Sequence, residues 1–274
     1  MAQKMLLFDL DDTLLTSEKI ITPRSVDAIK ACKEKNMLVG YITGRARAMQ
    51  NEVCFTEKYN LPKDFIANYN GAEIYAGDTA IESNVIPYAS AMQIILGLYA
   101  SYPNAKIGVY HEPWSYLKLK NKPDGENWNM RTGEKIKCAI SELPQYDVQR
   151  IRIEFDARAD TEKNKLSEFM TEQTIFFINA DGSAMIINKN ATKERALKKA
   201  SEYFNIKLAD IIAFGDDIND MEMLKAAGIG VAMGNAIDAV KQAADYTTET
   251  NDNEGIVAWI NKYFEREEYI SCLQ

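Results

Sequence analysis

The sequence has little of several residue types on which common kinds of site chemistry depend. It contains one histidine, which disfavours zinc sites and catalytic triads that use histidine. Its four cysteines are widely scattered and include no Cys-x-x-Cys pair. This spacing predicts free thiols in a reducing compartment rather than a disulfide framework. The chemistry of the protein must therefore rest on other side chains.

Positive charge and long apolar runs are also scarce. The chain carries 32 lysines and arginines against 40 aspartates and glutamates, a formal net charge of −8. That balance argues against a nucleic-acid partner, whose surface requires clustered positive charge. No run approaches the ~18 apolar residues of a membrane span, and no signal-peptide pattern follows the first methionine. We therefore predict a cytoplasmic protein with no membrane association and no evident obligate protein partner.

The overall composition is that of a folded protein. Hydrophobic residues make up 46% and charged residues 26% of the 274 residues, without an internal repeat or a low-complexity tract. This length suits one large domain or two smaller ones, and it buries enough surface for a core without disulfides.

Short apolar runs alternate with helical patterns at both ends of the chain. The helical patterns have recognisable starts at Thr22-Pro23 and at Thr192. Such alternation is typical of a parallel α/β sheet covered by helices, so we predict a doubly wound, Rossmann-like core. The expected strands are residues 5–8, 38–42, 65–67, 211–214 and 229–233.

The middle of the chain has a different pattern. An Asp181-Gly182 turn between two apolar runs predicts an antiparallel hairpin, which is uncommon in parallel sheets. We therefore predict a core domain of residues 1–82 and 189–274, interrupted by an inserted α+β domain of residues 83–188. The expected elements of the insert are helices at 88–100 and 161–172 and strands at 106–111, 148–155, 174–178 and 184–188.

Acidic residues follow two of the predicted parallel strands, in Asp9-Leu10-Asp11-Asp12 and in Gly215-Asp216-Asp217-Ile218-Asn219-Asp220. Ligands bind at the carboxyl ends of strands in open parallel sheets. Carboxylates gathered at that edge repel one another unless a cation lies between them. Mg²⁺ prefers carboxylates, carbonyls, waters and phosphate oxygens as ligands, so we predict that Mg²⁺ is this cation.

The Asp9-x-Asp11 pair also suggests a reaction. Two neighbouring carboxyl groups can take different roles, with Asp9 as a nucleophile and Asp11 as a proton donor. A carboxylate that attacks a phosphate dianion needs positive charge to offset the repulsion. Lys193, directly after the predicted helix cap, combines a cation with a helix N-terminus, and Thr43 and the Gly44 amide offer neutral donors.

In this order, these segments resemble the four motifs of the haloacid dehalogenase-like phosphatase superfamily, and specifically its Cof-type sugar-phosphatase-like members. Other segments that match are Asn70-Gly71-Ala72, Gly234-Asn235-Ala236 and Glu254-Gly255-Ile256. The resemblance covers both ends of the chain. It implies that residues 83–188 form a cap domain that determines substrate specificity.

The resemblance also implies a role for each matching residue. Asp9 would attack phosphorus, and Asp11 would protonate the leaving group and then activate water. Mg²⁺ would bind the Asp9 carboxylate, the Asp11 backbone carbonyl and Asp216. Asp217 or Asp220 would lie behind these ligands and orient a metal-bound water or Lys193. The implied phosphate-binding residues are Leu10, Thr43, Gly44, Lys193 and Asn219.

The function we predict is a Mg²⁺-dependent phosphatase that hydrolyses small phosphorylated metabolites, such as sugar phosphates, through an aspartyl-phosphate intermediate. A phosphomutase shares the first half of this chemistry and is the alternative enzyme. A non-enzymatic protein that binds phospho-ligands, or a phosphorylated switch, is the alternative outside enzymes. The length and the inserted segment disfavour the receiver type of switch.

Overall fold

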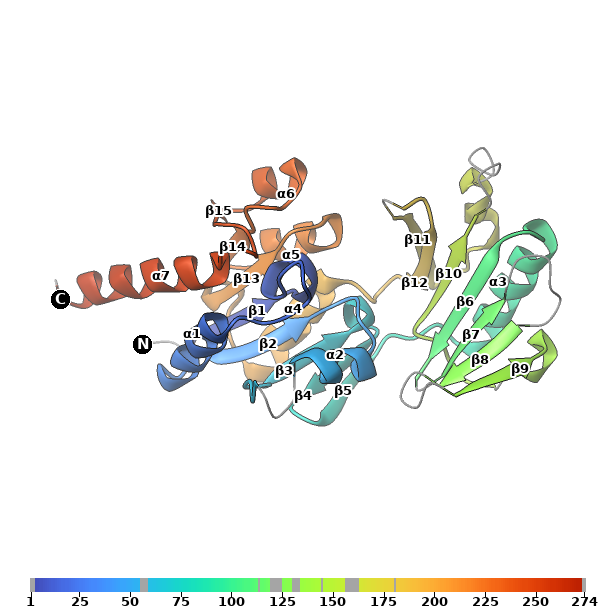
Figure 1. The fold of residues 1–274 in the computed structure, drawn as a ribbon, viewed down its shortest axis with the longest axis horizontal. Coiled ribbons are helices and arrows are strands. Elements are labelled where there is room, and N and C mark those ends of the chain that lie inside the picture. Colours follow the sequence, from blue (N-terminus) through green and yellow to red (C-terminus); the bar gives the residue numbers. More distant parts are fainter. Residues whose placement is uncertain are drawn as a thin grey trace. The chain divides into compact units, whose positions relative to one another are not determined.

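A computed structural model describes residues 3–54, 59–112, 114–118, 125–129, 134–143, 145–155, 163–179 and 181–272. Contacts between Cα atoms divide the chain into two compact units (Figure 1). The core unit comprises Met1–Arg45, Gln50–Glu82 and Thr192–Gln274. The inserted unit comprises Ala46–Met49 and Ser83–Ala191.

The core unit is built on an eight-stranded sheet in which strands distant in sequence lie side by side. In the order given below, each strand from β15 to β3 runs parallel to the next one, whereas β4 pairs antiparallel with β3. The strand order is β15 (Tyr246–Thr247), β14 (Ile229–Ala232), β13 (Ile211–Gly215), β1 (Met5–Phe8), β2 (Leu38–Ile42), β3 (Phe65–Asn68), β4 (Glu73–Ala76) and β5 (Thr79–Ser83).

Successive strand residues point to opposite faces of this sheet, so its apolar strands present hydrophobic side chains on both faces. Helices cover both of these faces. Leu6 and Phe8 of β1 pack in one cluster with α1 (Pro23–Glu34) and α7 (Gly255–Cys272). Met5 and Leu7 pack in another with α4 (Lys193–Phe204), α5 (Met221–Ala226) and α6 (Asp238–Ala243). The predicted doubly wound α/β fold is confirmed. Helix α2 (Arg47–Cys54) follows β2 in the chain.

The predicted helix starts are present as caps. The Thr22 side chain accepts a hydrogen bond from the Ser25 amide at the start of α1, and Pro23 takes the first helical position. The Thr192 side chain likewise accepts from the Arg195 amide, which fixes the first residue of α4. No helix in the described ranges is both long and apolar enough to cross a membrane.

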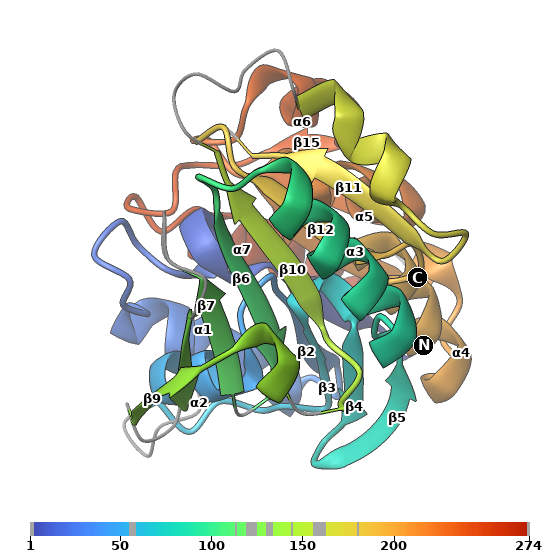
Figure 2. The same cartoon turned by 90° about the vertical axis from the view of Figure 1, so that its right-hand side faces the viewer.

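The inserted unit is a second sheet with a separate hydrophobic core, and helix α3 (Tyr88–Ser101) lies along one face of the sheet (Figure 2). The predicted hairpin is present as an antiparallel pair. The strand order is β11 (Thr174–Ile178), β12 (Ala184–Asn188), β10 (Arg150–Glu154), β6 (Lys106–His111), β7 (Trp114–Lys118), β8 (Gly125–Asn129) and β9 (Lys135–Cys138).

The sequence prediction missed three strands in each unit. In the core sheet these are β4, β5 and β15, which were not among the expected strands. In the inserted unit these are β7 to β9, which lie in a stretch rich in asparagine, lysine and tryptophan. The helix expected over 161–172 is a 3₁₀ segment, Lys163–Phe169, and positions 161 and 162 lie outside the described residues. Cys32 and Cys138 are buried free thiols, and the side chains of Cys54 and Cys272 fall outside the described part.

Candidate active site

The polar residues singled out in the sequence come together at one edge of the core sheet. Asp9 follows β1, Thr43 follows β2, and Asp216 follows β13. Because β1 pairs in parallel with both β2 and β13, the loop that begins at Asp9 lies between the other two. The Asp9 amide continues the pairing by donating to the Phe214 carbonyl at 3.0 Å. The strand ends therefore bring these three side chains to one place.

Lys193 occupies the centre of this edge. Its Nζ donates to Asp9 Oδ1 at 2.5 Å and to Asp220 Oδ1 at 2.6 Å. The three residues are between 0% and 5% exposed. A lysine so deeply buried is paired rather than solvated, and its charge is available to a bound anion at the same edge.

Two glycines make this placement possible. Gly71 has a φ of +110°, and a Cβ on it would lie 3.0 Å from the Thr192 carbonyl at the start of α4. The absence of a side chain lets the turn after β3 pack against the residue that precedes Lys193. At Gly215, a Cβ would lie 2.5 Å from Asp220 Cβ, so only glycine leaves room for that carboxylate.

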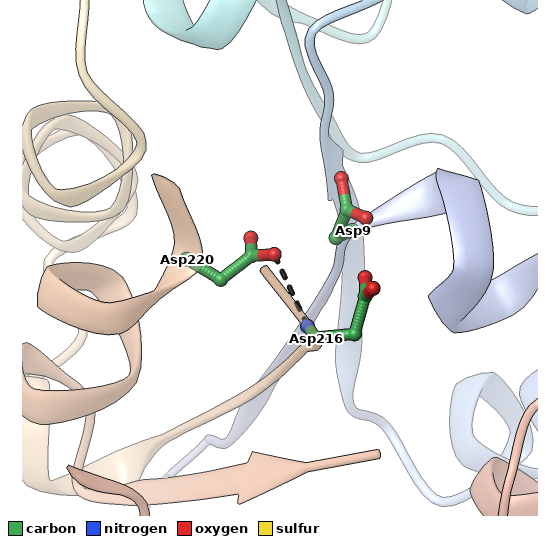
Figure 3. A group of neighbouring side chains, drawn as sticks. All are labelled: Asp9, Asp216 and Asp220. Atoms are coloured by element: carbon green, nitrogen blue, oxygen red, sulfur yellow. Dashed lines mark hydrogen bonds between the residues drawn. The ribbon is translucent and has the colours of Figure 1, made fainter. Parts of the chain in front are cut away.

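The buried Asp220 carboxylate, rather than that of Asp217, binds Lys193. The second oxygen of Asp220 accepts the Asp216 amide at 3.1 Å and the Asp217 amide at 3.2 Å, the first of which is drawn in Figure 3. The Asp217 side chain is exposed and caps its own short turn by accepting from the Ile218 amide. Of the two residues considered from the sequence, the structure brings Asp220 to Lys193.

The carboxylates at this edge outnumber the lysine between them. Asp9, Asp216 and Asp220 offer oxygens within 4.8 Å of one another (Figure 3). Burial raises the pKa of Asp9 well above its ordinary value, despite the opposing charge of Lys193. Burial and the charge of Asp220 raise the pKa of Asp216 to about 7. Burial acts to lower the pKa of Lys193, but Asp220 and Asp9 more than offset it, so the lysine stays charged.

The donor set fits a hard divalent cation. Both oxygens of Asp220 are used by Lys193 and by backbone amides, and one oxygen of Asp9 is used by Lys193. Asp216 accepts from the Thr13 hydroxyl through one oxygen at 2.9 Å. Among the described contacts, this leaves one carboxylate oxygen each on Asp9 and Asp216. A cation between them would offset the burial and the neighbouring negative charge that raise both pKa values.

Asp11 lies in an ion pair that the sequence analysis missed. Arg45 Nε and Nη2 bind its two oxygens at 2.7 and 2.6 Å, and Lys19 Nζ lies 3.3 Å from it. Burial acts to raise the pKa of Asp11, but Arg45 and Lys19 outweigh it and the pKa lies below its ordinary value. The loops after β1 and β2 are neighbours in the sheet, and this adjacency was the signal that could have identified Arg45.

The neutral candidates form a second group at the same edge. Asn219 Nδ2 donates to Asn70 Oδ1 at 3.2 Å, and the Asn70 amide donates to the Thr43 carbonyl at 2.8 Å. Gly44 packs against Asn70, whose Oδ1 lies 3.4 Å from where a Cβ on the glycine would be. Leu10 is buried directly after Asp9. Asn70, noted in the sequence only as part of a matching segment, thus connects three of the predicted residues.

Comparisons with known proteins agree with this architecture. A curated 5-amino-6-(5-phospho-D-ribitylamino)uracil phosphatase of Bacillus subtilis is 27% identical over 264 residues, which is 95% of each chain. A solved haloacid dehalogenase-like hydrolase of B. subtilis is 23% identical, with a TM-score of 0.79 over 94% of this chain and 99% of that one. A solved haloacid dehalogenase subclass IIB sugar phosphatase is 24% identical, with a TM-score of 0.75 over 95% of this chain and 99% of that one.

The family assignment rests on a match along nearly the whole chain. The family model described as haloacid dehalogenase-like hydrolase matches residues 6–260. This range contains all four of the segments on which the sequence resemblance was based. The chain therefore belongs to the haloacid dehalogenase-like hydrolases, as its sequence predicts.

Proposed function

We propose that this hydrolase is a Mg²⁺-dependent phosphatase that cleaves small phosphate monoesters through an aspartyl phosphate on Asp9. The observation that carries the proposal is the buried Lys193, held between Asp9 and Asp220 at the carboxyl edge of a parallel sheet. This arrangement places a fixed positive charge beside a carboxylate nucleophile. The names of the curated relatives, which are phosphatases, favour hydrolysis over the phosphomutase alternative.

In the first half-reaction, one carboxylate oxygen of Asp9 attacks phosphorus, and its other oxygen is the one that would hold the metal. The bond between phosphorus and the leaving oxygen breaks, and Asp11 supplies the proton that the leaving alcohol needs. Lys193, the Thr43 hydroxyl, Asn219 and the amides of Leu10 and Gly44 offset the charge on the phosphoryl oxygens. The products of this half are an alcohol and the aspartyl phosphate.

In the second half-reaction, water attacks the phosphorus of the aspartyl phosphate. Asp11 takes one proton from that water, the bond to the Asp9 oxygen breaks, and inorganic phosphate leaves. The ion pair of Asp11 with Arg45 favours the ionised carboxylate, which is the form that this second half requires. The first half requires a protonated Asp11, so the contact with Arg45 must loosen when the substrate binds.

The metal site of the proposal is formed by the Asp9 and Asp216 carboxylates and the Asp11 backbone carbonyl. Bound Mg²⁺ supplies positive charge that stabilises the phosphoryl group as it is transferred. Asp220 holds Lys193 and the Asp216 amide in place rather than binding the metal, because both of its oxygens are already used. Asp217 caps its turn.

For the substrate, we propose phosphorylated sugars, polyols and related metabolites. One relative is named for a phosphoribitylamino-uracil and one solved neighbour is a sugar phosphatase, and both names describe a phosphate on a polyol or sugar. Residues 83–188 remain our predicted specificity domain. Its sequence is the part of the chain least similar to known motifs, so the leaving group must be found by experiment.

The proposal predicts hydrolysis that depends strictly on Mg²⁺. We expect the purified protein to release phosphate from an aryl phosphate and from members of a panel of sugar and polyol phosphates. Removal of the metal with EDTA should lower the rate by about 100-fold or more, because metal charge contributes several kcal/mol to such reactions. Phosphate release measured with and without Mg²⁺ tests this. No hydrolysis of any panel member, or equal rates with and without EDTA, would contradict the proposal.

A pH dependence of Mg²⁺ binding follows from Asp216. Its raised pKa of about 7 means that the free protein holds a proton there below neutral pH. The metal requires the carboxylate, so proton and metal compete and affinity falls as pH falls. For one competing proton, the apparent affinity should weaken by about tenfold per pH unit below 7. Calorimetric titrations of Mg²⁺ at pH 5.5, 6.5 and 7.5 test this, and a pH-independent affinity would contradict it.

A further inference from the structure

The turn that carries Asp11 has a backbone that its own sequence does not favour. Residues Leu10–Leu14 form a single wide turn in which Asp11 has extended angles and Asp12 has a φ of +59°. The left-handed conformation costs a residue with a side chain roughly 1–2 kcal/mol. Within the turn, the Leu15 amide donates to the Leu10 carbonyl at 2.8 Å and closes the loop. The conformation needs further support from outside.

That support comes from the C-terminal part of the core unit. Asn235 Nδ2 donates to the Asp12 carbonyl at 2.7 Å, at the left-handed residue itself. Asn251 Nδ2 donates to the Leu15 carbonyl at 2.9 Å. These two side chains bind backbone carbonyls in the middle and at the end of the turn, from positions 223 and 236 residues further along the chain.

The two asparagines are joined to each other. The Asn251 amide donates to Asn235 Oδ1 at 3.0 Å, so both ends of the Asn235 side chain are engaged. This pairing also fixes which end is oxygen, because a backbone amide must meet an acceptor and a carbonyl must meet a donor. Asn235 is itself held by its neighbour Gly234, whose amide donates to the Glu249 carbonyl at 3.0 Å. The loops after β14 and β15 thus form one support for the turn.

We propose that Asn235 is a positioning residue for the reaction, and that with Asn251 it clamps the turn of residues 10–15 so that Asp11 faces the substrate correctly relative to Asp9. Asn235 binds the carbonyl of the residue next to Asp11. The clamp fixes both the Asp11 carboxyl group and the Asp11 carbonyl by fixing the backbone between them. This inference rests on the proposed phosphatase function.

The sharpest test is Asn235→Asp, which keeps the shape and the acceptor but loses the donor. It also places a negative charge against the Asp12 carbonyl. We expect kcat to fall by roughly 10–100-fold with KM changed by less than about threefold, because misplacement of a catalytic group slows the chemical step more than it weakens binding. A rise in KM at unchanged kcat would overturn the proposal, since it would mean that Asn235 contacts the substrate instead.

Asn253→Asp is the matched control. It makes the same chemical change two residues after Asn251, at an exposed position that, among the described contacts, enters the loop through its backbone amide alone. We expect its kcat and KM to stay within about twofold of the unmodified protein. A second variant, Asn251→Asp, should reproduce the loss of kcat. The double variant Asn235→Asp/Asn251→Asp should lose less than the product of the two, as expected for one coupled network.

Hydrogen exchange separates this proposal from the proposed function. In Asn235→Asp, amides of residues 10–20 should exchange faster, by about fivefold or more, while peptides from β1 and α4 keep their protection. This readout does not depend on activity. If the unmodified protein hydrolyses no phosphate ester but the exchange changes as stated, the clamp holds the turn and the proposed function fails. Unchanged exchange in residues 10–20 with a normal kcat would overturn the clamp alone.

Discussion

Replacement of Asp9 by asparagine should abolish turnover and leave the fold intact. The amide is nearly the same size, but it cannot form the acyl-phosphate bond, so we expect kcat to fall by about 10⁴-fold or more. Burial raises the pKa of Asp9, which means that folding disfavours its charge, and Lys193 keeps Asp220 as a partner. The Mg²⁺-free variant should therefore unfold at the same temperature as the unmodified protein or higher.

The measurement combines steady-state hydrolysis with mass spectrometry of acid-quenched enzyme. The unmodified protein should carry one phosphoryl group under turnover, and Asp9→Asn should carry none. Asp27→Asn, the same change at an exposed position of α1, is the control and should behave normally. Full activity in Asp9→Asn, or an unchanged phosphoryl adduct, would show that another residue is the nucleophile.

The second large effect is expected at Lys193, whose replacement by methionine should impair both stability and activity. Methionine fills a similar volume but leaves Asp9 and Asp220 buried beside each other without a counter-charge. Loss of one partner from a buried ion pair typically costs about 3–5 kcal/mol. The cost should be larger at pH 8 than at pH 5, because at low pH the Asp9 carboxyl, whose pKa burial raises, can take up a proton and remove the repulsion.

Urea denaturation at both pH values measures this, and Lys198→Met provides the control. Lys198 lies on the same helix, is exposed, and pairs with Glu194 at the surface, so its loss should change the free energy of unfolding by no more than about 0.5 kcal/mol. Adding Asp220→Asn to Lys193→Met should recover part of the lost stability. Equal destabilisation by both Lys→Met changes would be incompatible with a buried pair at Lys193.

Much of the site could be predicted because a parallel sheet gathers its loops at one edge. The apolar runs before Asp9, Thr43 and Asp216 identified three strands, and their carboxyl ends meet irrespective of their separation in the sequence. The cap residue Thr192 identified where α4 begins and so where Lys193 lies. These inferences needed only strand direction and one helix start.

The parts that could not be predicted depend on which side chain meets which within that edge. The neighbouring loops after β1 and β2 indicate that Arg45 lies near Asp11, but they do not show that its guanidinium binds both oxygens of Asp11. Asn235 was visible only as part of a matching segment, and its contact with the Asp12 carbonyl depends on a left-handed backbone that is uncommon for any residue other than glycine. Strands β7 to β9 are short and mix polar with aromatic residues, so periodicity did not reveal these three strands of the second sheet.

The hydrogen bonds that hold the nucleophile's loop have a consequence for how the protein is made. The turn after β1 is synthesised well before the residue that holds it, because Asn251, which binds the Leu15 carbonyl, follows 236 residues later. At about 5–20 residues per second, a ribosome needs roughly 10–50 s to cover that interval. For most of that time β1 lacks its neighbour β13, because the inserted unit is translated between the two strands. The nascent chain must therefore keep β1 from pairing wrongly until β13 emerges.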